Sequence, residues 1–173
     1  GGGASRFAVS ACERNIMSSS SPAILFLCLG NICRSPLAEG AARVAFQEAG
    51  IAATLDSAGT GDWHIGRAPD PRAQAEAVRR GTDISDLRAR QLSVSDFYDF
   101  DYILAADAQN IADARAIMPA DATAKLQLML DWAADYPRTS VTDPYYGDDD
   151  GFAETWADVS AVADALVRHY QQG

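Results

Sequence analysis

Cysteine is scarce in this sequence, and the few cysteines present lack the spacing of metal ligands. The chain of 173 residues contains three of them, Cys12, Cys28 and Cys33. An odd number without ligand spacing argues against a disulfide scaffold and against a metal site, and it fits a reducing compartment. We therefore expect a cytoplasmic protein that holds no metal.

Long apolar runs are also missing. The chain has no stretch of the roughly 18 apolar residues that a transmembrane helix needs. Residues 1–22 are small and polar and lack the apolar core of a secretory signal. We interpret them as a disordered tail or a remnant of an expression vector, with Met17 as the natural start. Residues 23–173 are interpreted as one domain, and Cys12 is given no role.

Positive charge is in short supply. Lys125 is the only lysine, and the net charge is −10. So acidic a chain does not suit nucleic acid or an anionic membrane as a partner. A hydrophobic fraction of 48% and a charged fraction of 22% are ordinary for a globular domain with a real core. Any anion bound by this chain must therefore lie in a locally positive pocket.

One stretch near the start has the order of residues that such a pocket requires. Residues 23–28 form an uncharged apolar run, which is typical of a strand buried on both faces. Gly30 and Asn31 follow, and both tolerate the left-handed backbone of a tight loop. Ser35 and Pro36 then predict a helix start, with Ser35 as the cap and Pro36 at the first helical position.

A thiol and an arginine flank this predicted loop. Cys28 ends the strand and Arg34 precedes the helix cap. Backbone N–H groups of a strand-to-helix loop and the helix dipole favour a bound dianion, and a guanidinium grips two of its oxygens. The same field favours a thiolate at Cys28. A lone cysteine after an apolar strand is usually a core residue, and a Cys-x5-Arg spacing alone is common by chance. The conjunction of strand, loop, arginine and helix favours a nucleophile instead.

The rest of the chain alternates strands with helices. Further strands are predicted at 52–57, 102–106 and 126–129, and helices at 70–81, 107–118 and 151–171, with a weaker helical segment at 92–100. This alternation predicts a single-domain α/β fold with a parallel sheet and helices on both faces. Ligands of such sheets bind beyond the carboxyl ends of the strands, where Cys28 lies.

Several segments resemble those of a known family. The sequence Cys-Leu-Gly-Asn-Ile-Cys-Arg-Ser-Pro at 28–36 resembles the signature loop of the low-molecular-weight protein tyrosine phosphatases. Segments 56–59, 62–63, 89–91, 100–104 and 143–147 resemble further family segments in family order. The resemblance extends from about residue 24 to the last helix. It implies a three-layer flavodoxin-like fold with four parallel strands, and a metal-independent phosphatase that needs no cofactor.

The resemblance also implies roles for individual residues. Cys28 would form a cysteinyl-phosphate intermediate, Arg34 would bind the phosphoryl oxygens, and Asp143 would act as general acid and then general base. The implied phosphate-binding loop, which also accommodates inorganic phosphate or other oxyanions, comprises Leu29, Gly30, Asn31, Ile32, Cys33 and Ser35. An Asp-Pro pair alone often just starts a turn, so Asp143 has a purely structural alternative.

Aromatic side chains are expected to wall the crevice. Trp63, Tyr145 and Tyr146, with Leu29 and Ile32, resemble the wall positions and suit a flat phenol ring. The resemblance implies a phosphotyrosine-containing protein, such as a tyrosine kinase, as the partner, and we expect the enzyme to be a monomer. Ile32 favours phosphotyrosine, because related phosphatases that act on phosphoarginine tend to carry threonine there. Trp63 as a plain core residue is the alternative, and His64 is expected at the rim.

Three features qualify the resemblance. Ser57 is expected to support Asn31, but Leu87 stands where the family often has a histidine. Cys33 is expected to form a reversible disulfide with Cys28 under oxidation, with a buried packed thiol as the alternative. Two other functions, an arsenate reductase and a phosphate-binding module, fit these residues less well. An arsenate reductase needs further cysteines downstream, and none follows Cys33. A phosphate-binding module needs neither Cys28 nor Asp143.

Overall fold

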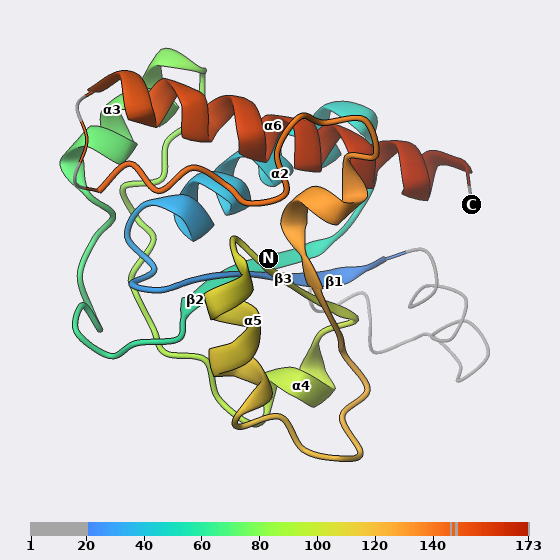
Figure 1. Ribbon diagram of the computed structural model, residues 1–173. Helices are drawn as coiled ribbons and strands as arrows, with labels where there is room; N and C mark the ends of the chain where they lie inside the picture. Colours follow the sequence, from blue (N-terminus) through green and yellow to red (C-terminus); the bar gives the residue numbers. More distant parts are fainter. Residues whose placement is uncertain (1–20, 146, 148, 173) are drawn as a thin grey trace, which may run out of the picture.

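A parallel sheet forms the centre of the computed structural model, which describes residues 21–145, 147 and 149–172 (Figure 1). The strands are β1 (Ala23–Cys28), β2 (Thr54–Gly59), β3 (Tyr102–Ala105) and β4 (Lys125–Leu128), in the order β2-β1-β3-β4. The helices are α2 (Arg34–Ala49), α3 (Pro71–Arg79), α4 (Asp96–Asp99), α5 (Ala108–Arg115), the 3-10 helix η2 (Met129–Trp132) and α6 (Asp149–Gln172). The predicted α/β fold with four parallel strands is confirmed.

Strand β1 is the middle of the core because both of its faces are covered. Ile24 and Phe26 pack with α2 and α6 on one face, and Leu25 and Leu27 pack with α4 and α5 on the other. Successive side chains of a strand alternate between faces, so an uninterrupted apolar run fills both. Figure 1 shows the resulting three layers, with α2, α3 and α6 above the sheet and α4 and α5 below it. Burial of each of these side chains contributes about 2–3 kcal/mol.

The first and last residues of several helices and strands differ from the predictions. β2 spans Thr54–Gly59, two residues later than predicted, because its pairing with β1 aligns Thr54 with Ala23 and Gly59 with Cys28. The helix predicted to reach residue 118 ends at Arg115, and the segment predicted at 92–100 is helical only in α4. Pro22, assigned to the tail, accepts a 2.8 Å hydrogen bond from Thr54 N. Residues 1–20 of that tail lie outside the described part.

Two aspartates begin helices as the sequence indicates. Asp70 accepts a hydrogen bond from the N–H of Arg72 and caps α3. Asp107 caps α5 through a capping box with Asn110, in which each side chain accepts from the other residue's N–H. Both caps satisfy backbone donors that a helix start leaves free. Asp107 lies two residues beyond β3 at the carboxyl edge of the sheet, and the N–H of Asp70 donates to Ile32 O in the loop after β1.

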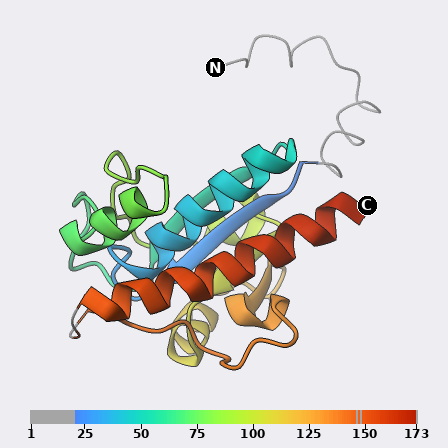
Figure 2. The same ribbon diagram turned by 90° about the horizontal axis from the view of Figure 1, so that it is seen from above.

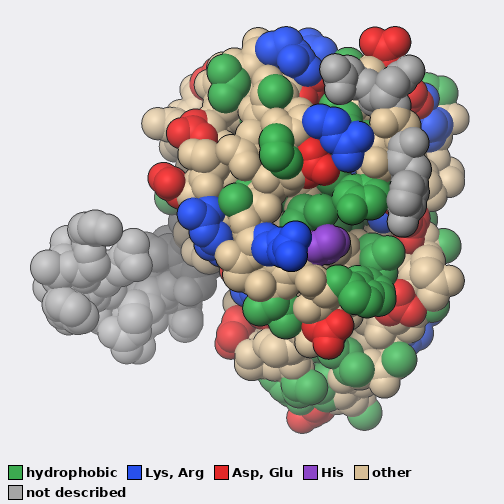
Figure 3. Space-filling view, turned by 90° about the vertical axis from the view of Figure 1, so that its left-hand side faces the viewer, with side chains coloured by type: hydrophobic (Ala, Val, Ile, Leu, Met, Phe, Trp, Pro, Cys, Tyr) green, Lys and Arg blue, Asp and Glu red, His purple; other side chains and the backbone are tan. Residues whose placement is uncertain are grey.

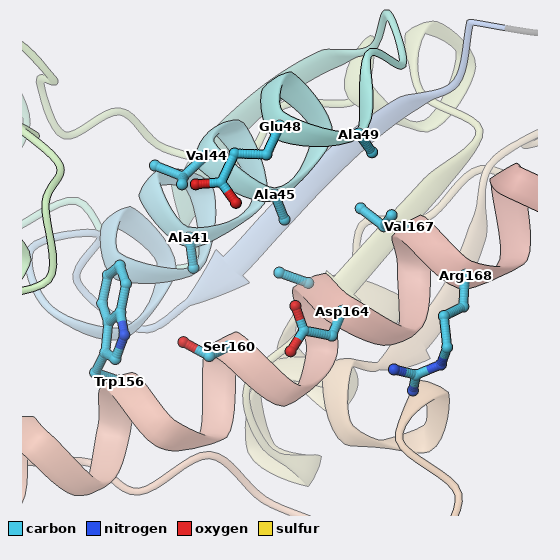
Figure 4. A pocket seen from close by; sticks show the side chains of 11 residues that line it. Ala41, Val44, Ala45, Glu48, Ala49, Trp156, Ser160, Asp164, Val167 and Arg168 are labelled. Atoms are coloured by element: carbon cyan, nitrogen blue, oxygen red, sulfur yellow. The ribbon is translucent and has the colours of Figure 1, made fainter.

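Helices α2 and α6 lie side by side over one face of the sheet (Figure 2). Ala41, Ala45 and Ala49 point from α2 towards α6 in Figure 4, where Trp156 and Val167 lie opposite them. These small side chains leave a hollow of about 540 Å³ between the two helices. No helix in the described part of the chain is long and apolar enough to cross a membrane.

Candidate active site

The loop between β1 and α2 folds around the sulfur of Cys28. Asn31 has φ 58°, the left-handed conformation that Asn adopts more readily than most residues. This turn directs the N–H of Asn31 at Cys28 Sγ, 3.3 Å away. Ser35 Oγ lies 3.0 Å from the same sulfur. Cys28 is therefore buried at the edge of the core cluster, as a core residue would be, but its sulfur also has two polar neighbours.

The side chain of Asn31 is bonded on all sides. Its Nδ2 lies 2.7 Å from Ser35 Oγ and 3.0 Å from Ser57 Oγ, and its Oδ1 accepts from the N–H of Arg90 at 3.0 Å. Ser57 Oγ donates in turn to Glu39 Oε1 at 2.8 Å. These contacts fix a backbone conformation that an L-residue seldom adopts. The Arg90 N–H and Glu39 were not among the predicted site residues.

Ser35 does not cap the helix, contrary to the prediction. The N-cap of α2 is Cys33, and no side chain caps this end. The Ser35 hydroxyl points instead at Cys28 and Asn31, so it cannot reach the free N–H groups of the first turn. Pro36 is the third residue of α2 and not the first. It still lies among the positions whose N–H has no partner within the helix.

Arg34 is only 4% exposed and is surrounded by acceptors. Its Nη1 lies 2.7 Å from Asp107 Oδ2 and 3.4 Å from Val141 O, and its Nη2 lies 3.7 Å from Asp143 Oδ2. Burial opposes the charge of this guanidinium, but Cys28, Asp107 and Asp143 outweigh it and raise the pKa of Arg34. The arginine is thus a fixed cation beside the thiol.

Asp107 is a site residue that was not predicted, although a helix was predicted to begin at the same position. Burial opposes its ionisation, yet the hydrogen bond from Arg34 lowers the pKa of the carboxyl group. The signal that could have identified Asp107 is its place directly after a predicted strand. Asp107 follows β3, which pairs with β1, and the carboxyl ends of neighbouring parallel strands meet at one edge. Arg34 and Asp107 were therefore bound to be close.

Leu87 occupies the position where the family often has a histidine. Its side chain is partly buried against the core cluster that includes Phe26 and Leu37. It thus lies in an apolar contact, and the Oδ1 of Asn31 is bonded by the N–H of Arg90. The support of Asn31 is arranged without a histidine in this chain.

Cys33 differs from Cys28 in its surroundings. Both are free thiols. Burial, and next the charge of Asp70, raise the pKa of the Cys33 thiol far above its usual value. Cys33 is therefore protonated at neutral pH and does not compete as a nucleophile. Its predicted redox role stays a prediction.

A cavity of about 370 Å³ opens above this loop. Its lining consists of loop residues, two exposed aromatics, one histidine and one aspartate: Cys28, Leu29, Gly30, Ile32, Cys33, Arg34, Trp63, His64, Asp143 and Tyr145. Trp63 is 66% exposed, so the alternative that it belongs to the core is wrong. Figure 3 shows this end of the molecule, where hydrophobic side chains gather beside a histidine and basic side chains. The predicted wall residue Tyr146 lies outside the described residues.

Asp143 faces the cavity from the segment before α6. Its side chain is 50% exposed, and its Oδ1 accepts from the N–H of Tyr145 at 3.1 Å. That contact is the turn expected of an Asp-Pro pair. The other carboxylate oxygen lies toward Arg34. The turn contact therefore uses one oxygen of Asp143 and leaves the other beside Arg34, so the turn does not exclude a role in the site.

Comparison with known proteins agrees with this geometry. A family model described as low molecular weight phosphotyrosine protein phosphatase matches residues 23–172. The protein of that name from Schizosaccharomyces pombe is 44% identical over 136 residues, which are 77% of this chain and 86% of that protein.

Solved structures give the same result. A protein tyrosine phosphatase of Entamoeba histolytica with Hepes in its active site superposes with a TM-score of 0.83 and is 33% identical. The match covers 88% of this chain and 98% of the Entamoeba chain. A Drosophila arginine phosphatase has a TM-score of 0.80 and 29% identity, covering 86% and 98%. The sheet, the loop and the relatives lead to one conclusion: this chain is an enzyme of the low molecular weight protein tyrosine phosphatase family.

Proposed function

We propose that this enzyme hydrolyses phosphotyrosine in proteins, and small aryl phosphates, through a cysteinyl-phosphate intermediate and without a metal ion. The observation that carries the proposal is the convergence of Cys28, Arg34 and Asp143 on one cavity. These side chains offer a nucleophile, a cation for the phosphoryl oxygens and a proton donor. Together they supply every group that the reaction needs.

In the first step, Cys28 attacks phosphorus as a thiolate, the form that the second step regenerates, in line with the phenol oxygen. The S–P bond forms while the P–O bond to the tyrosine ring breaks, and Asp143 gives its proton to the departing oxygen. Charge on the three equatorial oxygens is met by Arg34 and by N–H groups of the loop. Arg34 needs little reorganisation, because Asp107 and Val141 O already hold its guanidinium.

In the second step, water attacks the phosphorus of the intermediate. Asp143, now a carboxylate, accepts a proton from this water, and Cys28 leaves as a thiolate. Ser35 Oγ lies 3.0 Å from the sulfur and can donate a hydrogen bond to it as charge returns. Inorganic phosphate is then left in the loop and is released.

Selection of phosphotyrosine follows from the walls of the cavity. Exposed Trp63 and Tyr145 provide apolar faces for a phenol ring, which phosphoserine lacks. Phosphorylated proteins such as tyrosine kinases are therefore the proposed partners. Ile32 lines the same cavity and disfavours phosphoarginine. We expect kcat/KM to be at least about tenfold higher for a phosphotyrosine peptide than for a phosphoarginine peptide. Comparable values would contradict this choice.

Hydrolysis of p-nitrophenyl phosphate in the presence of EDTA tests the central proposal. Wild type should turn over, and Cys28→Ser should lose roughly 10⁴-fold or more of kcat, since the nucleophile is gone. Cys12→Ser is the matched control and should match wild type. Trapping of a phosphorylated Cys28 in a rapid quench, read by mass spectrometry, identifies the intermediate directly. Reduced wild type that binds phosphate without turnover would instead be a phosphate-binding module.

A further inference from the structure

Helix α6 contains a fully buried carboxylate for which the reaction has no direct use. Asp158 has 0% exposure, and so has Thr155 one turn earlier. A buried charge is costly unless polar partners surround it. Asp158 has such partners: Tyr136 OH donates at 2.5 Å, Arg138 forms an ion pair, and the N–H of Thr142 donates at 2.8 Å. All three partners lie in the segment that leads to Asp143.

Thr142 is held by α6 through both of its backbone polar groups. Its N–H donates to Asp158 Oδ2, and its carbonyl oxygen accepts from Thr155 Oγ1 at 2.8 Å. The Thr155 hydroxyl has one proton, and Gly151 O at 2.9 Å is its other acceptor. Positions 155 and 158 are three apart and share one face of the helix. The segment runs alongside α6 in Figures 1 and 2, so a single helix face can hold it.

The residue before Thr142 is held from the opposite side. The N–H of Val141 donates to Ala106 O at 2.9 Å, beyond the end of β3, and its carbonyl oxygen accepts from Arg34 at 3.4 Å. Four consecutive backbone polar groups, from Val141 N to Thr142 O, therefore have partners in the sheet edge, the loop arginine and α6. Asp143 is the next residue along the chain, and its carboxylate lies 3.7 Å from Arg34.

We propose that Thr155 and Asp158 are positioning residues that hold the Asp143 carboxyl group at the leaving oxygen of the substrate. They touch neither substrate nor Cys28, and they act through the backbone of Thr142. The inference rests on the proposed function, in which Asp143 is the proton donor. A donor displaced by about 1 Å loses a large part of its effect, because proton transfer requires hydrogen-bond geometry.

This role has a kinetic signature that depends on the leaving group. The phenolates of phenol and tyrosine are strongly basic, because the parent phenols have a pKa of about 10, so their departure needs a proton from Asp143. The nitro group of p-nitrophenol delocalises the negative charge, so p-nitrophenolate departs with less help from an acid. A poorly placed Asp143 therefore slows phenyl phosphate more than p-nitrophenyl phosphate. A general loss of folding or of phosphate binding slows both equally.

The experiment compares kcat/KM for these two substrates in Thr155→Val and Thr155→Ser. Valine has the shape of threonine without the hydroxyl, and we expect it to lower kcat/KM for phenyl phosphate about 10- to 100-fold and for p-nitrophenyl phosphate by about threefold or less. Serine restores the donor and should return both values to within about threefold of wild type. The inhibition constant of inorganic phosphate should not change in either variant, because the loop is untouched.

Two further variants guard the interpretation. Tyr136→Phe removes one donor to Asp158 and should shift the ratio of the two substrates in the same direction, by less. Thr123→Val is the matched control, since its hydroxyl contacts only Phe97 O and Tyr98 O among the contacts described, and the ratio should stay at the wild-type value. Equal losses on both substrates in Thr155→Val, or no rescue by serine, would overturn the positioning role alone. Wild type without Cys28-dependent turnover would overturn the proposed function itself.

Discussion

Two segments reach the same cavity, and they are held there in different ways. In the loop 28–34, Cys28 Sγ contacts Asn31 and Ser35, which are only three and seven positions away in the sequence. Contacts with residues distant in the sequence come one step further out, where Ser57 and Arg90 bond the side chain of Asn31. The segment 141–143 depends on Arg34, Ala106 and α6, none of which is its near neighbour in sequence. Cys28, the proposed nucleophile, is thus held largely by its own motif. Asp143, the proposed proton donor, is held by the tertiary fold.

The largest expected effect lies in the locally held loop. Arg34→Lys should lower kcat/KM for p-nitrophenyl phosphate by about 10²–10³-fold or more, because an ammonium cannot pair with Asp107 and grip two phosphoryl oxygens together. Steady-state kinetics and the inhibition constant of inorganic phosphate measure this, and both should worsen. An effect below about tenfold would mean that the N–H groups of the loop suffice.

The distant segment should give the next largest effect. Asp143→Asn keeps an oxygen for the N–H of Tyr145, so the turn should persist while the proton is lost. We expect kcat/KM for phenyl phosphate to fall about 10²-fold or more. Steady-state kinetics measure this, and the loss should be smaller for p-nitrophenyl phosphate, whose nitrophenolate departs with less help from an acid. Equal losses on both substrates would assign general acid catalysis to another residue.

A smaller effect is expected where the two segments meet. Asp107→Asn retains a good helix cap but loses the ion pair with Arg34. The folded-state pKa of Asp107 is lowered, so its charge stabilises the fold above the unfolded pKa of about 4, and that contribution is lost as pH falls. Chemical denaturation should show a loss of about 1–2 kcal/mol near neutral pH that vanishes under acid. A loss independent of pH would point to the cap instead.

The smallest effect should come from the outer support of the loop. Burial raises the folded-state pKa of Glu39, against hydrogen bonding from Ser57 and the charge of Arg43. A raised pKa means that this carboxyl group contributes stability below its unfolded pKa of about 4.3 and that the contribution is lost as pH rises. Relative to Glu39→Gln, wild type should therefore lose up to about 1 kcal/mol between acid and neutral pH. The opposite slope would show that the pair with Arg43 dominates.

The difference between the two segments also explains what the sequence could predict. The strand from Ala23 to Cys28 and the loop after it follow from neighbouring residues, and the strand was predicted to the residue. The following helix begins two residues earlier than predicted, because Ser35 contacts Cys28 and Asn31 and does not cap it. The ends of β2 also differ by two residues, because pairing with β1 sets them. Thr155 and Asp158 left no local signal, because a threonine and an aspartate on a helix usually face water. Their contact with Thr142 exists only once α6 has packed.

Asp107 illustrates how one position can answer to two kinds of selection. Its carboxylate closes the first turn of α5 and also pairs with Arg34. A library screened only for folded protein should accept asparagine, serine or threonine there, since each of them caps a helix well. A library screened for turnover should keep aspartate, because only a carboxylate neutralises the buried arginine. The two screens together would separate selection for folding from selection for catalysis at position 107.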